Sequence, residues 1–148
     1  MTTYRKILVA VDFSGAAHQV GVRALDLAGR YGAGLIFLHV VEYLPPLDLA
    51  YEPITTPDWM EDESVLLEAG RGSLRRFVQE LGAGEATQMV TIGTPKYEIT
   101  RIADEQGADL IVIGSHGRHG IRRLLGSTAN GVLHYATTDV LAVRLKDS

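Results

Sequence analysis

Residues 110–130 read Leu110-Ile-Val-Ile-Gly114-Ser-His-Gly117-Arg-His-Gly120-Ile-Arg-Arg-Leu-Leu-Gly126-Ser127-Thr128-Ala-Asn130. A short apolar run is followed by a glycine-rich segment and then by a pattern typical of a helix. Glycines let the main chain adopt positive φ angles and approach a ligand closely. Free N–H groups in the first turn of a helix, at the positive end of its dipole, attract anions. The stretch therefore predicts a strand, a phosphate-binding loop and a helix, and hence a nucleotide site.

The composition fits a water-soluble protein that binds neither nucleic acid nor membranes. The chain has 148 residues, 46% hydrophobic and 22% charged, which suits one domain with a substantial core. The formal net charge is −4, whereas nonspecific binding to nucleic acid or an anionic membrane favours a clustered basic surface. The absence of cysteine excludes disulfides, thiolate catalysis and cysteine-bound metals. We expect a single domain over residues 1–148, located in the cytoplasm, without a signal peptide or membrane span.

Apolar runs alternate with helical patterns along most of the chain. Runs that are apolar at every position favour strands buried on both faces, as in a parallel sheet. The helical segments carry apolar residues three or four positions apart, and Ser14 is expected to cap the first of them. Expected strands cover residues 7–11, 35–41, 86–92, 110–113 and 139–145, and expected helices cover residues 17–31, 61–81, 97–106 and 127–135.

This alternation predicts an α/β fold, with an open, mostly parallel five-stranded sheet flanked by helices on both faces. Ligands of such sheets bind beyond the carboxyl ends of the strands, where the strand order reverses. Asp12, Val41 and Gly114 all lie at carboxyl ends of expected strands, so they indicate one rim. Segment 42–60 interrupts the pattern with all but one of the five prolines. A loop of this length is usually functional or poorly ordered, and its aromatic residues either close over the site or pack on a partner.

Three motifs, in this order, resemble the universal stress protein family: Ile7-Leu-Val-Ala-Val-Asp12-Phe-Ser14, Gly93-Thr-Pro95, and Gly114-Ser-His-Gly117 with Gly126-Ser127. The resemblance covers nearly the whole chain. It implies a Rossmann-like sheet of strand order 3-2-1-4-5 and a homodimer joined through the last strands. In one branch of the family it also implies the binding of ATP or a related adenine nucleotide.

The number and spacing of the glycines distinguish the branches of the family. The ATP-binding branch usually carries Gly-x2-Gly-x9-Gly-Ser/Thr. Gly114 and Gly117 fit this pattern, but only eight residues separate Gly117 from Gly126. Another branch replaces the second and last glycines with larger residues and does not bind ATP. Because this chain keeps every glycine and also Ser127, we interpret it as the nucleotide-binding type.

The adenosine half of the expected site comes from the first two strands. Asp12 is expected to accept hydrogen bonds from a ribose hydroxyl or an adenine edge, although an ordinary turn or cap role explains the same residue. Ala10 and Val11 are expected to present backbone groups to adenine, and Val40 and Val41 to form an apolar wall. A plain role in the sheet core explains these four residues equally well.

The phosphate half comes from the glycine-rich stretch. Gly114, which follows Ile113, and Gly117 let the backbone pass close to ribose and phosphate, where the alternative is a tight turn. Arg118 between the glycines would neutralise a phosphate, although arginines in such runs more often face solvent. The expected ligands at the start of the last helix are Gly126, Ser127 and Thr128, of which Ser127 and Thr128 also serve as helix caps.

No resident metal site is predicted. His116 and His119 have His-x-x-His spacing, but no carboxylate cluster accompanies them in the loop. Mg²⁺ is expected only together with ATP, where phosphates and water molecules would hold it.

These features favour a nucleotide-binding regulatory module of the stress response that acts as a homodimer. Pairing with a second copy would cover the exposed edge of the last strand, Asp139-Val-Leu-Ala-Val-Arg-Leu145. One alternative is a slow ATPase, although the chain lacks Gly-x4-Gly-Lys-Ser/Thr and an evident general base. Another is a nucleotide-free dimeric module that binds a protein partner. A flavin-binding module is less favoured.

Overall fold

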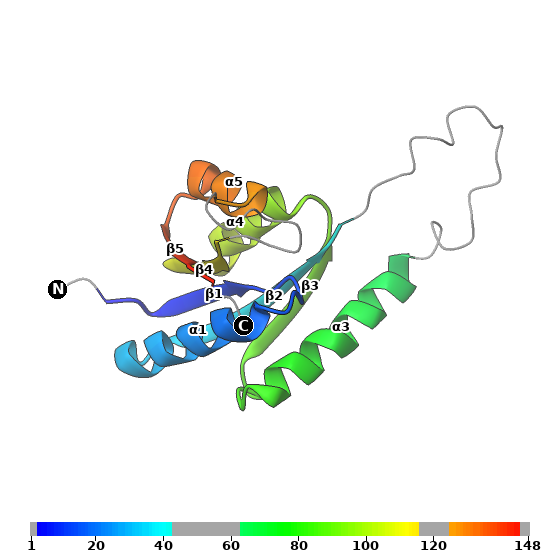
Figure 1. The fold of residues 1–148 in the computed structure, drawn as a ribbon, viewed down its shortest axis with the longest axis horizontal. Helices are drawn as coiled ribbons and strands as arrows, with labels where there is room; N and C mark the ends of the chain where they lie inside the picture. The colour runs from blue at the N-terminus through cyan, green and yellow to red at the C-terminus, as the bar shows by residue number, and fades with distance from the viewer. Residues whose placement is uncertain (1–2, 43–62, 116–124, 146–148) are drawn as a thin grey trace.

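The computed structural model describes residues 3–42, 63–115 and 125–145. In these ranges strands and helices alternate along the chain, as Figure 1 shows. The elements are β1 (Lys6–Ala10), α1 (Ala17–Tyr31), β2 (Gly34–Val41), α3 (Glu63–Glu80), β3 (Thr87–Ile92), α4 (Pro95–Gln106), β4 (Leu110–Gly114), α5 (Ser127–Tyr135) and β5 (Asp139–Val143).

The strands form one five-stranded parallel sheet in the order β3-β2-β1-β4-β5, which confirms the predicted fold class and strand order. Val9 of β1 lies opposite Phe37 of β2 on one side and Val112 of β4 on the other. The chain moves outward from β1 through β2 to β3 and then returns to the other side of β1. The strand order therefore reverses between β1 and β4, which is where sheets of this kind bind ligands.

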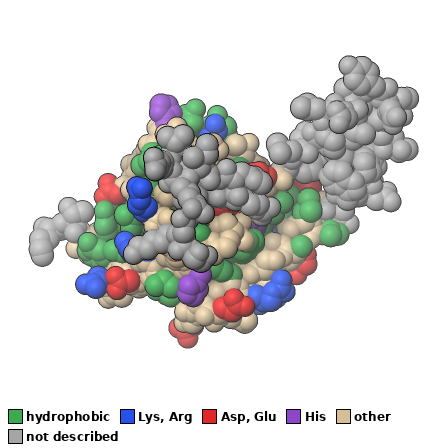
Figure 2. All heavy atoms as spheres, viewed as in Figure 1, with side chains coloured by type: hydrophobic (Ala, Val, Ile, Leu, Met, Phe, Trp, Pro, Cys, Tyr) green, Lys and Arg blue, Asp and Glu red, His purple; other side chains and the backbone are tan. Residues whose placement is uncertain are grey.

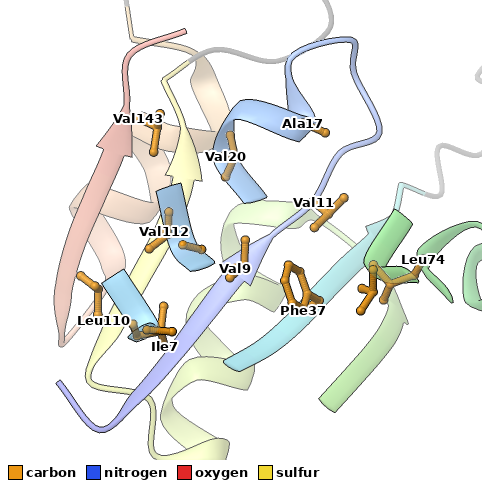
Figure 3. Packing of buried hydrophobic residues seen from close by; sticks show 13 residues of the cluster. Ile7, Val9, Val11, Ala17, Val20, Phe37, Leu74, Leu110, Val112 and Val143 are labelled. Carbon is orange, nitrogen blue, oxygen red and sulfur yellow. The ribbon is translucent and has the colours of Figure 1, made fainter. Parts of the chain in front are cut away.

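Helices cover both faces of the sheet, with α1 and α3 on one face and α4 and α5 on the other (Figure 1). Ile7 and Val9 of β1 pack on the α1 side, where Figure 3 shows them together with Phe37 and Leu74. Leu8, between them in sequence, packs on the α4 side. Successive strand residues point to opposite faces, so burial on both faces explains why the runs are apolar at every position.

The first helix begins differently from the sequence expectation. Ala16, not Ser14, occupies the N-cap position of α1, and no side chain caps this end. The Ser14 N–H instead donates to Asp12 Oδ1 at 2.9 Å, and the Ser14 carbonyl accepts from the Ala17 N–H at 3.0 Å. Ser14 is therefore part of the turn that leads into α1.

Some sequence expectations fall on residues outside the described ranges. Segment 42–60, apart from Glu42, is among them, so the roles expected for its prolines and aromatic residues stay predictions. None of the helices in residues 3–42, 63–115 and 125–145 is both long and apolar enough to cross a bilayer.

Candidate functional site

The candidate site is the rim where β1 and β4 end side by side. Val11 follows β1 directly and is buried, and Asp12 after it is exposed. Gly114 is the last residue of β4 and is half-buried. Because Val9 and Val112 are paired, Asp12 and Gly114 leave the sheet next to each other at the point where the strand order reverses.

Both backbone groups of Val11 already have partners within the protein. Its N–H donates to the Leu38 carbonyl at 2.8 Å. Its carbonyl accepts from His39 Nδ1 at 2.7 Å, which requires the proton of His39 to be on Nδ1. Any recognition of a ligand by the Val11 backbone must therefore use the second lone pair of its carbonyl oxygen.

Val40 and Val41, expected to form one apolar wall, end β2 with their side chains on opposite faces of the sheet, because Val40 packs on the α4 side and Val41 lies against Gly70 of α3. Val40 is buried, whereas Val41 and Ala10 are half-buried. The Val41 carbonyl accepts from the Gly93 N–H at 3.0 Å. Val41 can thus offer a ligand its side chain more readily than its backbone.

The glycine-rich loop is closed at its base by two backbone hydrogen bonds. The Ser115 N–H donates to the Val143 carbonyl of β5 at 2.9 Å, and the Gly126 N–H donates to the Ser115 carbonyl at 2.6 Å. Ile113 before the loop is buried in β4. The loop thus leaves and rejoins the fold at adjacent points, and α5 starts where it returns.

The start of α5 differs from the expectation that serine and threonine cap it. Gly126 occupies the N-cap position and has no side chain to contribute. Ser127 is the first helical residue and is exposed, and the half-buried Thr128 follows it. N–H groups in the first turn of a helix have no partner inside the helix. This end therefore offers backbone donors and a serine hydroxyl to an anion.

Several predicted site residues are not placed. Gly117 and Arg118 lie outside the described residues, as do His116 and His119. Their expected roles at a phosphate or a metal therefore stay predictions. Among the residues that are described, no group of three or more His, Cys, Asp or Glu side chains is arranged to hold a metal ion.

Charged side chains of both signs are mixed on the surface. Figure 2 shows lysines and arginines next to aspartates and glutamates on the visible part of the described residues. The strongest local pairing is on α4, where Arg101 donates to Glu98 Oε1 at 2.6 Å and to Glu105 Oε1 at 2.9 Å. The bond from Arg101 lowers the pKa of Glu98 despite partial burial. These ion pairs lie within α4.

Sequence reasoning missed one residue beside the rim. Phe13 has a φ of 58°, which is unusual for a residue other than glycine, and its ring lies 4.3 Å from that of His39 between centroids. A phenylalanine after Asp12 carries no sequence signal for this conformation. The His39 ring of β2 contacts both Phe13 and the Val11 carbonyl.

Known proteins of one family match this chain over nearly its full length. The model of the universal stress protein family matches residues 3–144. Universal stress protein A homolog 2 of Coxiella burnetii is 40% identical over 149 aligned positions, which cover 100% of both chains. Universal stress protein A homolog 1 of the same organism is 35% identical and covers 97% of this chain and 99% of the relative.

Solved structures show the same architecture. The universal stress protein UspA from Lactobacillus plantarum superimposes with a TM-score of 0.76 at 31% identity, covering 97% of this chain and 100% of the other. A universal stress protein solved in complex with cAMP superimposes with a TM-score of 0.66 at 27% identity, covering 97% and 98%.

Proposed function

Since this chain belongs to the universal stress protein family, we propose that it is a cytoplasmic regulatory module that binds an adenine nucleotide at the rim between β1 and β4. The observation that carries the proposal is the closure of the glycine-rich loop by the bond from Gly126 to Ser115. It brings the two ends of the loop together at the start of α5, and the loop leaves β4 next to the end of β1. The complex of a structural relative with cAMP supports the same ligand class.

The adenosine part of the ligand would lie against the ends of β1 and β2. Val40 would offer an apolar surface on the α4 side of the sheet and Val41 one on the α3 side, and the second lone pair of the Val11 carbonyl would offer an acceptor for the adenine amino group. The exposed Asp12 carboxylate would accept from a ribose hydroxyl with Oδ2, because Oδ1 already accepts from the Ser14 N–H. Ala10 and Ile113 would form the floor of the site within the sheet.

The phosphates would lie at the glycine-rich loop. We expect Gly114, Gly117 and Gly126 to leave room for them, and the N–H groups of Ser127 and Thr128 would face the anion at the positive end of α5. Arg118 would neutralise part of the charge. With ATP, Mg²⁺ would be held by phosphate oxygens and water rather than by a dedicated set of side chains.

The same proposal includes a homodimer formed through β5. This strand is the last in the sheet and pairs with β4 on one side. Its middle residues Val140, Leu141 and Ala142 are half-buried and apolar, so an uncovered outer edge invites pairing with another strand. Antiparallel pairing with β5 of a second copy gives a closed two-fold assembly. Light scattering at micromolar concentration should give the mass of two chains, and a monomer mass would contradict the dimer.

Calorimetric titration tests the ligand. We expect saturable binding of ATP with Mg²⁺ and of cAMP, and weaker binding of GTP. Adenine carries an amino group from which the Val11 carbonyl would accept, whereas guanine carries a carbonyl oxygen at the same position and cannot donate there. The absence of heat from adenine nucleotides at millimolar concentration would overturn the proposal. Equal affinity for ATP and GTP would show that the base is not recognised.

A further inference from the structure

A hollow of about 380 Å³ lies between the start of α1 and the second half of α3, on the face of the sheet that these helices cover. It is separate from the rim residues Asp12 and Gly114, neither of which lines it. Its volume falls in the range of small-molecule sites, about 300–1,000 Å³. The hollow therefore offers a second place for a ligand.

Two aromatic rings form the apolar part of this hollow. Phe13 and Phe77 have ring centroids 6.3 Å apart and pack edge to face. Both are half-buried, because Phe77 also packs on the core residue Phe37 and Phe13 packs on His39. Their remaining exposed surface lines the hollow, so an apolar ring of a ligand would bury it.

The polar part of the hollow favours an anion. Among the described residues, Arg76 makes one hydrogen bond, to Ser73 Oγ at 3.4 Å, and no ion pair. Glu80 lies four positions later on α3 but not within ion-pair distance of it. Opposite Arg76, the first turn of α1 contains His18 and no acidic residue. Within residues 3–42, 63–115 and 125–145 the guanidinium thus has no carboxylate partner, and it can pair with a planar carboxylate.

The geometry points to a site for a small aromatic carboxylate, with its ring against Phe13 and Phe77 and its carboxylate at Arg76. The neighbouring carboxylate of Glu80 opposes such a ligand. Replacing Glu80 by glutamine should therefore strengthen binding, whereas replacing Arg76 should weaken it. This proposal does not depend on nucleotide binding at the rim.

The test is a titration of ¹⁵N-labelled protein with benzoate, followed by NMR of backbone amides, with benzamide as the uncharged isostere. We expect benzoate to shift the amides of Gly15, His18 and Ser73 saturably, and benzamide to bind several-fold more weakly. Arg76→Gln should weaken benzoate about tenfold, since hydrogen bonds between charged groups are the stronger kind. Arg75→Gln is the matched control, because Arg75 is exposed on the same helix and does not line the hollow.

Four results would overturn the proposal. They are the absence of saturable shifts, equal binding of benzamide, equal weakening by Arg75→Gln and Arg76→Gln, and shifts confined to Gly114 and Ser115 at the rim. Stronger benzoate binding by Glu80→Gln would support the proposal, and weaker binding by this variant would also contradict it, because Glu80 would then not repel the ligand. A parallel titration in saturating ATP and Mg²⁺ distinguishes the two sites. Benzoate should bind with the same affinity in the presence of ATP and Mg²⁺. This result is expected whether or not ATP binds at the rim.

Discussion

The ring of His39 packs on the ring of Phe13, with 4.3 Å between their centroids, while the Nδ1 atom of His39 donates to the Val11 carbonyl at 2.7 Å. One side chain of β2 therefore holds the residues on both sides of Asp12. This contact fixes the turn between β1 and α1, from which one wall of the rim and one wall of the hollow beside α3 are made.

Two truncations of Phe13 should show how much its backbone conformation lowers the free energy of unfolding. Its φ of 58° lies in the left-handed region, which glycine adopts without strain. Both Phe13→Ala and Phe13→Gly lose the ring contacts, but alanine keeps the strain. We expect Phe13→Gly to be the more stable of the two by about 1 kcal/mol, measured by urea unfolding. Equal stabilities, or a more stable alanine variant, would contradict this account.

Gly131 should resist substitution because α5 crosses α4 at this residue. A Cβ placed there would lie 2.6 Å from Lys96 Cδ and 2.8 Å from Lys96 Cβ. We expect Gly131→Ala to lower the free energy of unfolding by about 1–3 kcal/mol. Gly29 of α1 is the control, because a Cβ there meets nothing within 4 Å, and Gly29→Ala should be stabilising by about 0.5–1 kcal/mol. Thermal unfolding that ranks the two variants in the reverse order would refute the packing argument.

Glu98 should contribute to stability only while it is ionised. Its pKa is lowered in the folded protein, chiefly by the hydrogen bond from Arg101. Its contribution is therefore present above the pKa of the unfolded chain and is lost as pH falls through the lower folded pKa. At pH 7, Glu98→Gln should cost up to about 1 kcal/mol, since the partner is largely exposed.

The cost of Glu98→Gln should vanish in acid, below the folded pKa. Glu68→Gln is the control, because Glu68 and Arg71 are 3.5 Å apart with both side chains largely exposed. That variant should match the parent protein throughout. Denaturant unfolding from pH 7 to pH 3 compares them, and a cost of Glu98→Gln that persists unchanged at pH 3 would argue against an ionic contribution.

Two substitutions of Asp12 should distinguish its role in the turn from its proposed role in ligand binding. Its Oδ1 accepts from the Ser14 N–H at 2.9 Å, and an asparagine retains this acceptor. We expect Asp12→Asn to keep the stability of the parent and Asp12→Ala to lose about 1 kcal/mol. Both variants should bind ATP more weakly in calorimetry, because each lacks the charged acceptor for ribose. Full affinity in Asp12→Asn would restrict this residue to the turn.

Gly117→Val should block nucleotide binding by filling the space that the phosphates need. Circular dichroism should show an unchanged fold, because the loop is joined at its base through Ser115 and Gly126. Gly84→Val is the control, at an exposed glycine outside the loop where a Cβ meets nothing within 4 Å. It should bind ATP like the parent protein. Unchanged affinity in a folded Gly117→Val variant would remove this loop from the proposed site.

The fold could be predicted because burial leaves a direct trace in the sequence. β1 and β4 are apolar at consecutive positions, since both faces of the central strands are covered. Helix starts were less predictable. Ser14 has the residue type of an N-cap, yet its N–H donates to Asp12 and α1 begins only at Ala17, with Ala16 as the N-cap. Local hydrogen bonds of this kind depend on the path of the turn rather than on residue type.

The candidate site could be predicted in position but not in detail. The carboxyl ends of β1 and β4 follow from the element order, which puts Asp12 and Gly114 on the same rim. The partners of the Val11 and Val41 backbones could not be foreseen, because main-chain hydrogen bonds leave no side-chain signature. Phe13 carries no signal either, since its conformation is imposed by His39 and Phe77 through packing.

The bond between Gly126 and Ser115 makes the length of the intervening segment independent of the rest of the molecule. Because the two ends meet directly, residues can be added or removed between them without displacing α5 or changing the register of β5. The spacing of eight residues between Gly117 and Gly126, one fewer than usual, therefore need not displace α5. In the proposed site, loop length could therefore differ between proteins on this scaffold while the first turn of α5 keeps its place.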